Sequence, residues 1–224
     1  MTVDVTAVND APTASNNTVT TNEDTTYTFT ASDFGFSDVD GDTLSSVTVS
    51  ALSGSDGTFL LNGVAITGST SVTKTQIDSG LLTFVPDSNE NGSSYNTFTF
   101  TVNDGTTDSA SSYTMTVDVT AVNDAPTASN NTVTTNEDTD HTFAASEFGF
   151  TDVDGDSLDH VSIETLPSNG TLLLSGVAIS AGDQISAANI SNLVFRPAAN
   201  ANGASYDTFT FTVNDGTTDS ASSY

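Results

Sequence analysis

Two short acidic loops are the part of the sequence best suited to chemistry. They are Asp38-x-Asp40-x-Asp42 and Asp152-x-Asp154-x-Asp156. Three carboxylates within five residues repel one another strongly unless a cation neutralises them. Alternate aspartates in a loop can direct their oxygens to a single Ca²⁺, which takes six to eight hard oxygen ligands. The spacing therefore predicts a calcium site at each loop.

Neither loop has the sequence of an EF-hand. The sixth position is Thr43 or Ser157 where an EF-hand has Gly, and the twelfth is Val49 or Ile163 where it has Glu. The ion would therefore need ligands from distant parts of the chain. A single aspartate, such as the one in Asp104-Gly105, has an equally good interpretation as a turn former.

The composition favours a cation as the partner. The net charge is −27 and the pI is about 4.1, so the chain repels nucleic acid and anionic membranes. Acidity that serves solubility alone is the alternative explanation. There is no cysteine, so neither a disulfide nor a thiolate metal site can form. No apolar run has membrane-spanning length, and we expect no insertion into a membrane.

A long internal repeat organises the chain. Residues 1–25 recur unchanged as 115–139, and residues 97–113 recur as 208–224. We therefore predict a tandem array with 1–8 as the last strand of a preceding repeat, 9–122 as repeat 1, and 123–224 as repeat 2 without its final strand. Because Met1 aligns with Met115 inside a predicted strand, we expect the sequence to be an excised fragment.

Short alternating segments separated by turn residues predict strands throughout each repeat. In repeat 1 these segments are 17–21, 27–31, 58–66, 81–85, 95–102 and 111–122. The segment 58–66 is predicted to be a hairpin that turns at Asn62-Gly63, and residues 75–80 a short helical turn. About seven strands without a long helix predict two tandem immunoglobulin- or cadherin-like antiparallel β-sandwiches, an all-β fold.

An immunoglobulin-like strand order would gather the acidic residues at the two ends of each sandwich. In repeat 2 we expect the acidic loop and Asp215 to lie beside the entering linker, Asn123 and Asp124. The turn at Glu23 and Asp24 and the loop that follows Pro86 would lie at the opposite end of repeat 1. The linker would thus lie between two carboxylate-rich ends.

These residues resemble a known family. The linker Asp118…Asn123-Asp124-Ala125-Pro126, the loop Asp152-Val153-Asp154-Gly155-Asp156 and the segment Asn22-Glu23-Asp24 are similar to the calcium motifs of cadherin repeats. They are more similar to the cadherin-like tandem repeats of large bacterial RTX-type adhesins, over the whole length of both repeats. The resemblance implies a calcium-rigidified extender on the bacterial cell surface, exported by type I secretion, that projects a distal domain for cell adhesion or biofilm formation.

The resemblance also implies a set of calcium ligands shared between neighbouring repeats. By position these are Asn9, Asp10, Glu23, Asp38, Asp40, Asp42, Asp87, Glu90, Asp104, Asn123, Asp124, Asp152, Asp154, Asp156 and Asp215. The Asp-Arg-Glu element of cadherins is missing, which makes Asp87 and Glu90 the weakest members of the set. Repeat 2 has alanines in the corresponding loop, residues 198–201, so we expect poor calcium binding there.

Two other functions compete with this interpretation. Catalysis is disfavoured because the histidines, His141 and His160, have no counterpart in repeat 1, and no nucleophile accompanies a base. We therefore expect that the chain is not an enzyme. A ligand-binding module for carbohydrate or a host protein remains the alternative, and exposed Tyr or Phe side chains would favour it.

Residues 1–8 suggest a further partner. They have the sequence of the strand that repeat 2 is predicted to lack. We expect that in this chain they can complete repeat 2 of another molecule, head to tail, by donating a strand.

Overall fold

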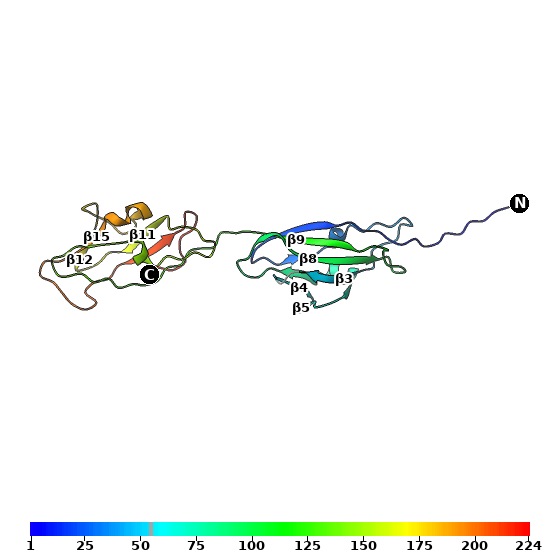
Figure 1. The fold of residues 1–224 in the computed structure, drawn as a ribbon, viewed down its shortest axis with the longest axis horizontal. Coiled ribbons are helices and arrows are strands. Elements are labelled where there is room, and N and C mark those ends of the chain that lie inside the picture. Colours follow the sequence, from blue (N-terminus) through cyan, green and yellow to red (C-terminus); the bar gives the residue numbers. More distant parts are fainter. Residues whose placement is uncertain (54–55) are drawn as a thin grey trace. The chain divides into compact units, whose positions relative to one another are not determined.

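The computed structural model describes residues 1–53 and 56–224, which form two compact units (Figure 1). Unit 1 is Met1–Val122 and unit 2 is Asn123–Tyr224. Each unit has two sheets with a hydrophobic core, which confirms the predicted fold of two tandem immunoglobulin-like β-sandwiches. In the described part of the chain, no helix is long and apolar enough to cross a membrane.

The described residues of unit 1 form nine strands and two short helices. In chain order they are β1 (Asn17–Asn22), β2 (Tyr27–Thr28), η1 (Ala31–Phe34), β3 (Ser46–Ser53), β4 (Thr58–Leu61), β5 (Val64–Ala65), β6 (Thr70–Thr73), α1 (Lys74–Asp78), β7 (Leu82–Val85), β8 (Gly92–Asn103) and β9 (Tyr113–Thr120). One sheet has the order β1-β9-β8-β3-β6 and the other β2-β7-β4-β5.

The local sequence explains most of these elements. The hairpin β4–β5 turns at Asn62 and Gly63, whose φ angles of +51° and +74° are those a type I′ turn requires. Thr73 caps α1 by accepting a hydrogen bond from the N–H of Gln76. Most strand pairs are antiparallel, but β1 pairs with β9 in parallel, from Asn17 opposite Met115 onward.

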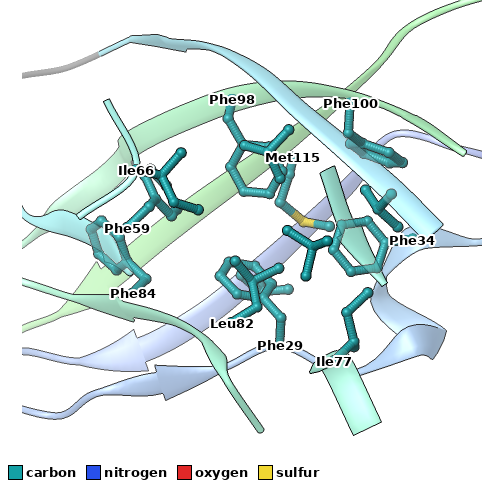
Figure 2. Packing of buried hydrophobic residues seen from close by; sticks show 14 of the residues in the cluster. Phe29, Phe34, Phe59, Ile66, Ile77, Leu82, Phe84, Phe98, Phe100 and Met115 are labelled. Atoms are coloured by element: carbon teal, nitrogen blue, oxygen red, sulfur yellow. The ribbon is translucent and has the colours of Figure 1, made fainter. Parts of the chain in front are cut away.

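Strand β9 contributes one face to the core of unit 1. Its residues Met115, Val117 and Val119 are at most 3% exposed, while Thr116 and Asp118 between them point away from the core. Phe98 and Phe100 of β8 lie beside Met115 (Figure 2). Phe59 and Phe84 come from the other sheet, and Phe29 directly follows its strand β2. The strand that precedes the linker is therefore an integral part of the sandwich.

Unit 2 repeats this plan with fewer strands. Its elements are β10 (His141–Thr142), η2 (Ala145–Phe148), β11 (His160–Thr165), β12 (Gly170–Leu174), β13 (Val177–Ala178), β14 (Gln184–Ser186), η3 (Ala187–Asn192), β15 (Leu193–Pro197) and β16 (Thr210–Asn214). The sheets are β10-β15-β12-β13 and β14-β11-β16. The second sheet corresponds to β6-β3-β8 of unit 1, without counterparts of β9 and β1.

Two segments of the chain repeat the sequences of β1 and β9 but form no strand. Residues 131–136 repeat the sequence of β1 but form no strand, because no described segment of unit 2 takes the place of β9 beside them. Residues 1–8, which we predicted to be the last strand of a preceding repeat, are likewise not a strand and are fully exposed. Both segments lack the neighbouring strand that would supply their backbone hydrogen bonds.

Candidate metal sites

The acidic loop of unit 1 lies between η1 and β3 and wraps around one carboxylate. Asp38 Oδ1 accepts hydrogen bonds from the backbone N–H groups of Asp40 (2.8 Å) and Asp42 (3.2 Å). Gly41, at a φ angle of +85°, allows the backbone to turn between them. One carboxylate oxygen of each aspartate lies within 4.8 Å of the other two. The loop thus holds three carboxylates together, as the spacing predicts.

Unit 2 builds the same loop between η2 and β11. Asp152 Oδ1 accepts from the N–H groups of Asp154 (2.9 Å) and Asp156 (3.0 Å), and the three carboxylates again lie within 4.8 Å of one another. The two loops agree although η2 and β11 differ in sequence from their counterparts. The arrangement therefore follows from the loop residues themselves.

The first aspartate of each loop keeps one oxygen without a partner. Asp38 Oδ2 and Asp152 Oδ2 are buried and, within residues 1–53 and 56–224, accept no hydrogen bond. A buried carboxylate oxygen that accepts no hydrogen bond is unfavourable because it has lost its water without replacement. A cation bound by the loop would neutralise it, so this oxygen is the feature that fits the loop to a metal ion.

The residues that enter each sandwich lie against its acidic loop. In unit 1 the backbone N–H of Asp10 donates to Asp40 Oδ2 at 2.7 Å, and Asn9 Nδ2 donates to Asp104 Oδ2 at 3.0 Å. In unit 2 the corresponding bonds run from Asp124 to Asp154 (2.8 Å) and from Asn123 to Asp215 (2.9 Å). Segments about a hundred residues apart in the chain therefore meet at one end of each unit.

Asp104 and Asp215 are turn residues as well as members of these clusters. The N–H of Thr107 and the Asn9 side chain are the main causes that hold the pKa of Asp104 below its usual value. For Asp215, burial raises the pKa, but the Asn123 side chain and the N–H groups of Thr218 and Thr217 outweigh it, so the pKa is lowered. Both carboxylates therefore stay ionised near neutral pH and add negative charge to the cluster.

The residues of each cluster match the donor chemistry of calcium. Each cluster contains the three aspartates of the acidic loop, a fourth aspartate from the neighbouring turn, and an Asn-Asp pair from the entering segment. The atoms that these side chains can offer to a metal ion are hard oxygens. The members are Asn9, Asp10, Asp38, Asp40, Asp42 and Asp104 in unit 1, and Asn123, Asp124, Asp152, Asp154, Asp156 and Asp215 in unit 2. Calcium bound there would join the entering segment to the acidic loop.

The remaining predicted residues lie at the other end of unit 1. Glu23 is 2% exposed; its Oε1 accepts from the N–H of Val122 at 2.5 Å and its Oε2 from Asn91 Nδ2 at 3.5 Å. Glu90 accepts the hydroxyl hydrogen bond of Tyr95 at 3.0 Å. Burial and the bond to Glu90 raise the pKa of Tyr95 to about 12. Asp87 belongs to the same loop as Glu90. Its backbone N–H donates a hydrogen bond to the Tyr95 hydroxyl at 3.3 Å.

Glu23 therefore has a structural task that the sequence did not predict. It satisfies the backbone N–H of the last residue before the linker, where β9 has already ended. In unit 2 its copy Glu137 is exposed and accepts a hydrogen bond from Asn202 at 3.0 Å. The difference arises because Glu23 is covered by the end of β9, for which the described part of unit 2 has no counterpart.

This contrast predicts different effects of the same substitution in the two units. Glu23→Ala should destabilise unit 1 by roughly 2 kcal/mol, since it leaves the N–H of Val122 without its acceptor and opens a gap in the buried end. Glu137→Ala should change the stability of unit 2 by less than about 0.5 kcal/mol. Urea unfolding followed by peptide-resolved hydrogen exchange measures the two units separately. Equal losses would contradict the structural role of Glu23.

Two threonines of the site also escaped prediction. Asn9 Nδ2 lies 3.4 Å from Thr107 Oγ1, and Asn123 Nδ2 lies 3.4 Å from Thr218 Oγ1. Both threonines belong to the segment that recurs unchanged in the two repeats, but so do many residues of β8 and β16. Identity between repeats alone could not separate them from the residues of the core.

The fold and these sites define a class of tandem immunoglobulin-like modules that carry an acidic cluster at one end. The family model described as the bacterial Ig domain matches residues 9–120 and residues 123–223. The chain therefore belongs to the bacterial Ig domain family, with two copies in tandem. Domains of this family are typical of surface and secreted bacterial proteins.

Other comparisons add little to this assignment. No curated protein matches the chain. Among solved structures, an endo-fucoidan hydrolase of glycoside hydrolase family 107, MfFcnA4, is 18% identical with a TM-score of 0.30, and a variant of that enzyme is 19% identical with the same TM-score. The chain is covered to 94% and 95% but spans only 27% and 28% of those chains. Scores this low carry no functional argument.

Proposed function

We propose that the chain is a calcium-binding structural segment of a bacterial surface or secreted protein, in which bound ions stiffen the linkers between successive modules. The observation that supports this most directly is the contact between each entering segment and its acidic loop, Asp10 with Asp40 and Asp124 with Asp154. An ion held by these groups would fix the linker backbone to the module that follows. Because Asn123 comes directly after Val122, this would restrict the joint between the repeats.

The finer assignment follows from the motif resemblance. It describes an extender in the stalk of a large RTX-type adhesin, which projects a distal binding domain for adhesion or biofilm formation and leaves the cell by type I secretion. The net charge of −27 supports it, since the acidic ends of successive modules repel one another and a cation at the joint would be needed to hold them together. Neighbouring repeats and calcium are the partners of such a segment.

The burial of the aromatic side chains supports a structural role over ligand binding. The chain has 13 Phe and 5 Tyr residues and no Trp, and every one of these rings is buried or partly buried. Carbohydrate sites and protein hot spots usually present exposed aromatic side chains. Outside residues 1–8, the large exposed apolar residues of the described chain, such as Val39, Val64 and Val177, are scattered singly. Catalysis likewise receives no support from the clusters, which contain carboxylates and amides but no nucleophile beside a base.

Small-angle scattering tests the proposal on the chain of 224 residues. In excess calcium we expect a narrow distribution of interatomic distances, and in chelator a broader one, because the linker becomes free to bend. Asp152→Ala should give the broad distribution even with calcium, since it removes a ligand beside the linker. Asp219→Ala is the matched control: it removes the same charge from an exposed side chain of the neighbouring turn and should behave as the unsubstituted chain.

The possible outcomes separate binding from stiffening. If the scattering is the same with calcium and chelator although calcium raises the thermal stability, the ions bind but do not restrict the linker. If calcium alters neither property, the loops are ordinary solvated turns and the proposal is wrong. Equal behaviour of Asp152→Ala and Asp219→Ala would exclude the assigned site.

A further inference from the structure

Unit 2 contains both histidines of the chain, and the two have different surroundings. His141 Nε2 lies 3.2 Å from Glu147 Oε2. At the corresponding positions of unit 1, the hydroxyl of Tyr27 lies 3.2 Å from Asp33 Oδ2. His160, at the start of β11, stands where unit 1 has a serine. The plan shared by the two units therefore accounts for His141 but not for His160.

The ring of His160 is fixed by the residue that precedes it. Its Nδ1 lies 2.8 Å from Asp159 Oδ2, and an ionised carboxylate only accepts hydrogen bonds, so Nδ1 carries the hydrogen. In the neutral ring, Nε2 then has a free lone pair. The side chain of His160 is 15% exposed, and its Nε2 is buried without a hydrogen-bond partner among residues 1–53 and 56–224. A buried ring nitrogen in this state is unfavourable unless a proton or a metal ion binds it.

A second carboxylate faces this nitrogen. Asp219, in the turn that follows β16, places its Oδ1 3.9 Å from Nε2 of His160, which is too far for a hydrogen bond. The same Oδ1 accepts a hydrogen bond from Asn214 Nδ2 at 2.8 Å, so the carboxylate is held in this orientation. Two electron-pair donors thus face each other across a gap, and a cation between them would satisfy both.

The gap has the width that a zinc-like ion requires. Zn²⁺ lies about 2.0–2.1 Å from an imidazole nitrogen and about 2.0–2.2 Å from a carboxylate oxygen. One ion can therefore bond to both atoms across 3.9 Å, at a bond angle wider than tetrahedral. The Asp219 side chain is 59% exposed, so it is free to shift by the roughly half ångström that makes the angle tetrahedral. A proton cannot bridge the same gap, because a hydrogen bond needs the two atoms within about 3.2 Å.

The surrounding contacts match those of metal-binding histidines. A ligating imidazole usually donates its other N–H to a carboxylate, and a ligating carboxylate is itself hydrogen-bonded. Asp159 supplies the first of these contacts and Asn214 the second. An imidazole nitrogen suits zinc, copper and nickel, whereas calcium takes oxygen ligands. The site therefore differs in chemistry from the acidic clusters, which offer carboxylate and amide oxygens.

We propose that His160 Nε2 and Asp219 Oδ1 bind a transition-metal dication of the zinc class, with water in the remaining positions. Asp159 acts as a positioning residue that fixes the tautomer of His160. With two protein ligands, the site should bind more weakly than a structural zinc site, which has four. The ion would join the start of β11 to the turn after β16, which lie far apart in the sequence.

Unit 1 provides an internal control. Its Asn103 Nδ2 donates to Asp108 Oδ1 at 2.8 Å, the same bond that orients the carboxylate in unit 2. The histidine and the aspartate that precedes it are replaced by Ser46 and Ser45. Unit 1 thus has the carboxylate and its orienting amide but no nitrogen ligand, so we expect a site of this kind in unit 2 alone.

Nuclear magnetic resonance of the two histidine rings tests the proposal on the chain of 224 residues. Zn²⁺ is added in excess calcium, which fills the acidic clusters with an ion that does not favour nitrogen. Before the addition, Nδ1 of His160 should carry the hydrogen. Zinc should then shift the Nε2 resonance of His160 and leave those of His141 unchanged. Equal shifts of both rings, or a His160 ring that keeps protons on both nitrogens when zinc is added, would overturn the proposal.

Exchanging unit 2 residues for their unit 1 counterparts tests the ligands, with titration calorimetry of zinc in excess calcium as the measurement. His160→Ser should weaken zinc binding at least about tenfold, and His141→Tyr should leave it unchanged. Asp159→Ser should weaken it by about tenfold, and the resonances of His160 should then show a mixture of both tautomers. Equal effects of the two histidine substitutions would contradict the assigned ligand.

A matched pair of aspartates separates the site from general attraction of cations. Asp219→Asn and Asp108→Asn remove the same charge from corresponding turns of the two units. Asp219→Asn should weaken zinc binding by about tenfold, and Asp108→Asn should not change it. Equal losses would show that the acidic surface attracts zinc without this site, which would overturn the proposal. His160→Ser should keep the full response to calcium, so the zinc and calcium proposals stand or fall separately.

Discussion

Calcium should raise the midpoint of thermal unfolding by on the order of 10 °C. A single site occupied at a hundredfold excess over its dissociation constant stabilises the folded state by about 2.7 kcal/mol. For a domain of about 100 residues, each kcal/mol shifts the midpoint by about 4 °C. Extracellular calcium modules bind with constants of about 10⁻⁴–10⁻³ M, so tens of millimolar calcium would reach this regime. Calorimetry of the chain in calcium and in chelator measures the shift.

The substitution Asp38→Ala together with Asp152→Ala should abolish most of this gain. These aspartates provide the acceptor around which each loop folds and the buried oxygen without a hydrogen-bond partner. Without calcium, the double variant should lose at most about 1–2 kcal/mol of stability relative to the unsubstituted chain. It loses backbone hydrogen bonds, but it also relieves charge repulsion. The double variant Asp108→Ala and Asp219→Ala, with the same change in charge, should keep the full response.

Two further conditions separate a specific site from charge screening. A chain with a net charge of −27 is stabilised by any salt that screens its self-repulsion. Sodium chloride at matched ionic strength should therefore give only a small part of the shift. Magnesium should also give less than calcium, because it requires near-octahedral geometry and loses its water reluctantly. Equal shifts in calcium, magnesium and sodium would exclude a calcium site.

The acidic clusters could be predicted from the sequence because their geometry is local and repeated. The alternation of Asp38, Asp40 and Asp42 is sufficient to bring the three carboxylates together in a turn. The meeting of Asn123 with Asp215 was expected from the strand order of immunoglobulin-like folds, and the structure shows this contact. The fold class could be predicted for a similar reason. The alternating Phe and Val residues of a segment such as β8 indicate a strand with one buried face.

The role of Glu23 could not be predicted because it depends on a partner far away in the chain. The same sequence, Asn-Glu-Asp, surrounds both Glu23 and Glu137. One carboxylate is buried against Val122 and the other is exposed, and the difference lies entirely in whether β9 covers it. The parallel pairing of β1 with β9 escaped prediction for the same reason, since a period of two residues does not reveal strand direction.

Phe98→Ala should be the most destabilising single substitution considered, at about 3–5 kcal/mol for unit 1. Phe98 is 1% exposed, and its ring lies 5.7 Å from that of Phe29 and 5.0 Å from that of Phe59, both in edge-to-face contact. Phe209→Ala removes the copy of this ring from unit 2, where it is only partly buried. It should cost roughly 2 kcal/mol or less, because less apolar surface is lost from the interior.

Peptide-resolved hydrogen exchange measures the loss of stability in each unit separately. Because Phe98 is 1% exposed and Phe209 is only partly buried, the loss in unit 1 should exceed the loss in unit 2. Equal losses would mean that burial of the ring does not set the cost of removing it.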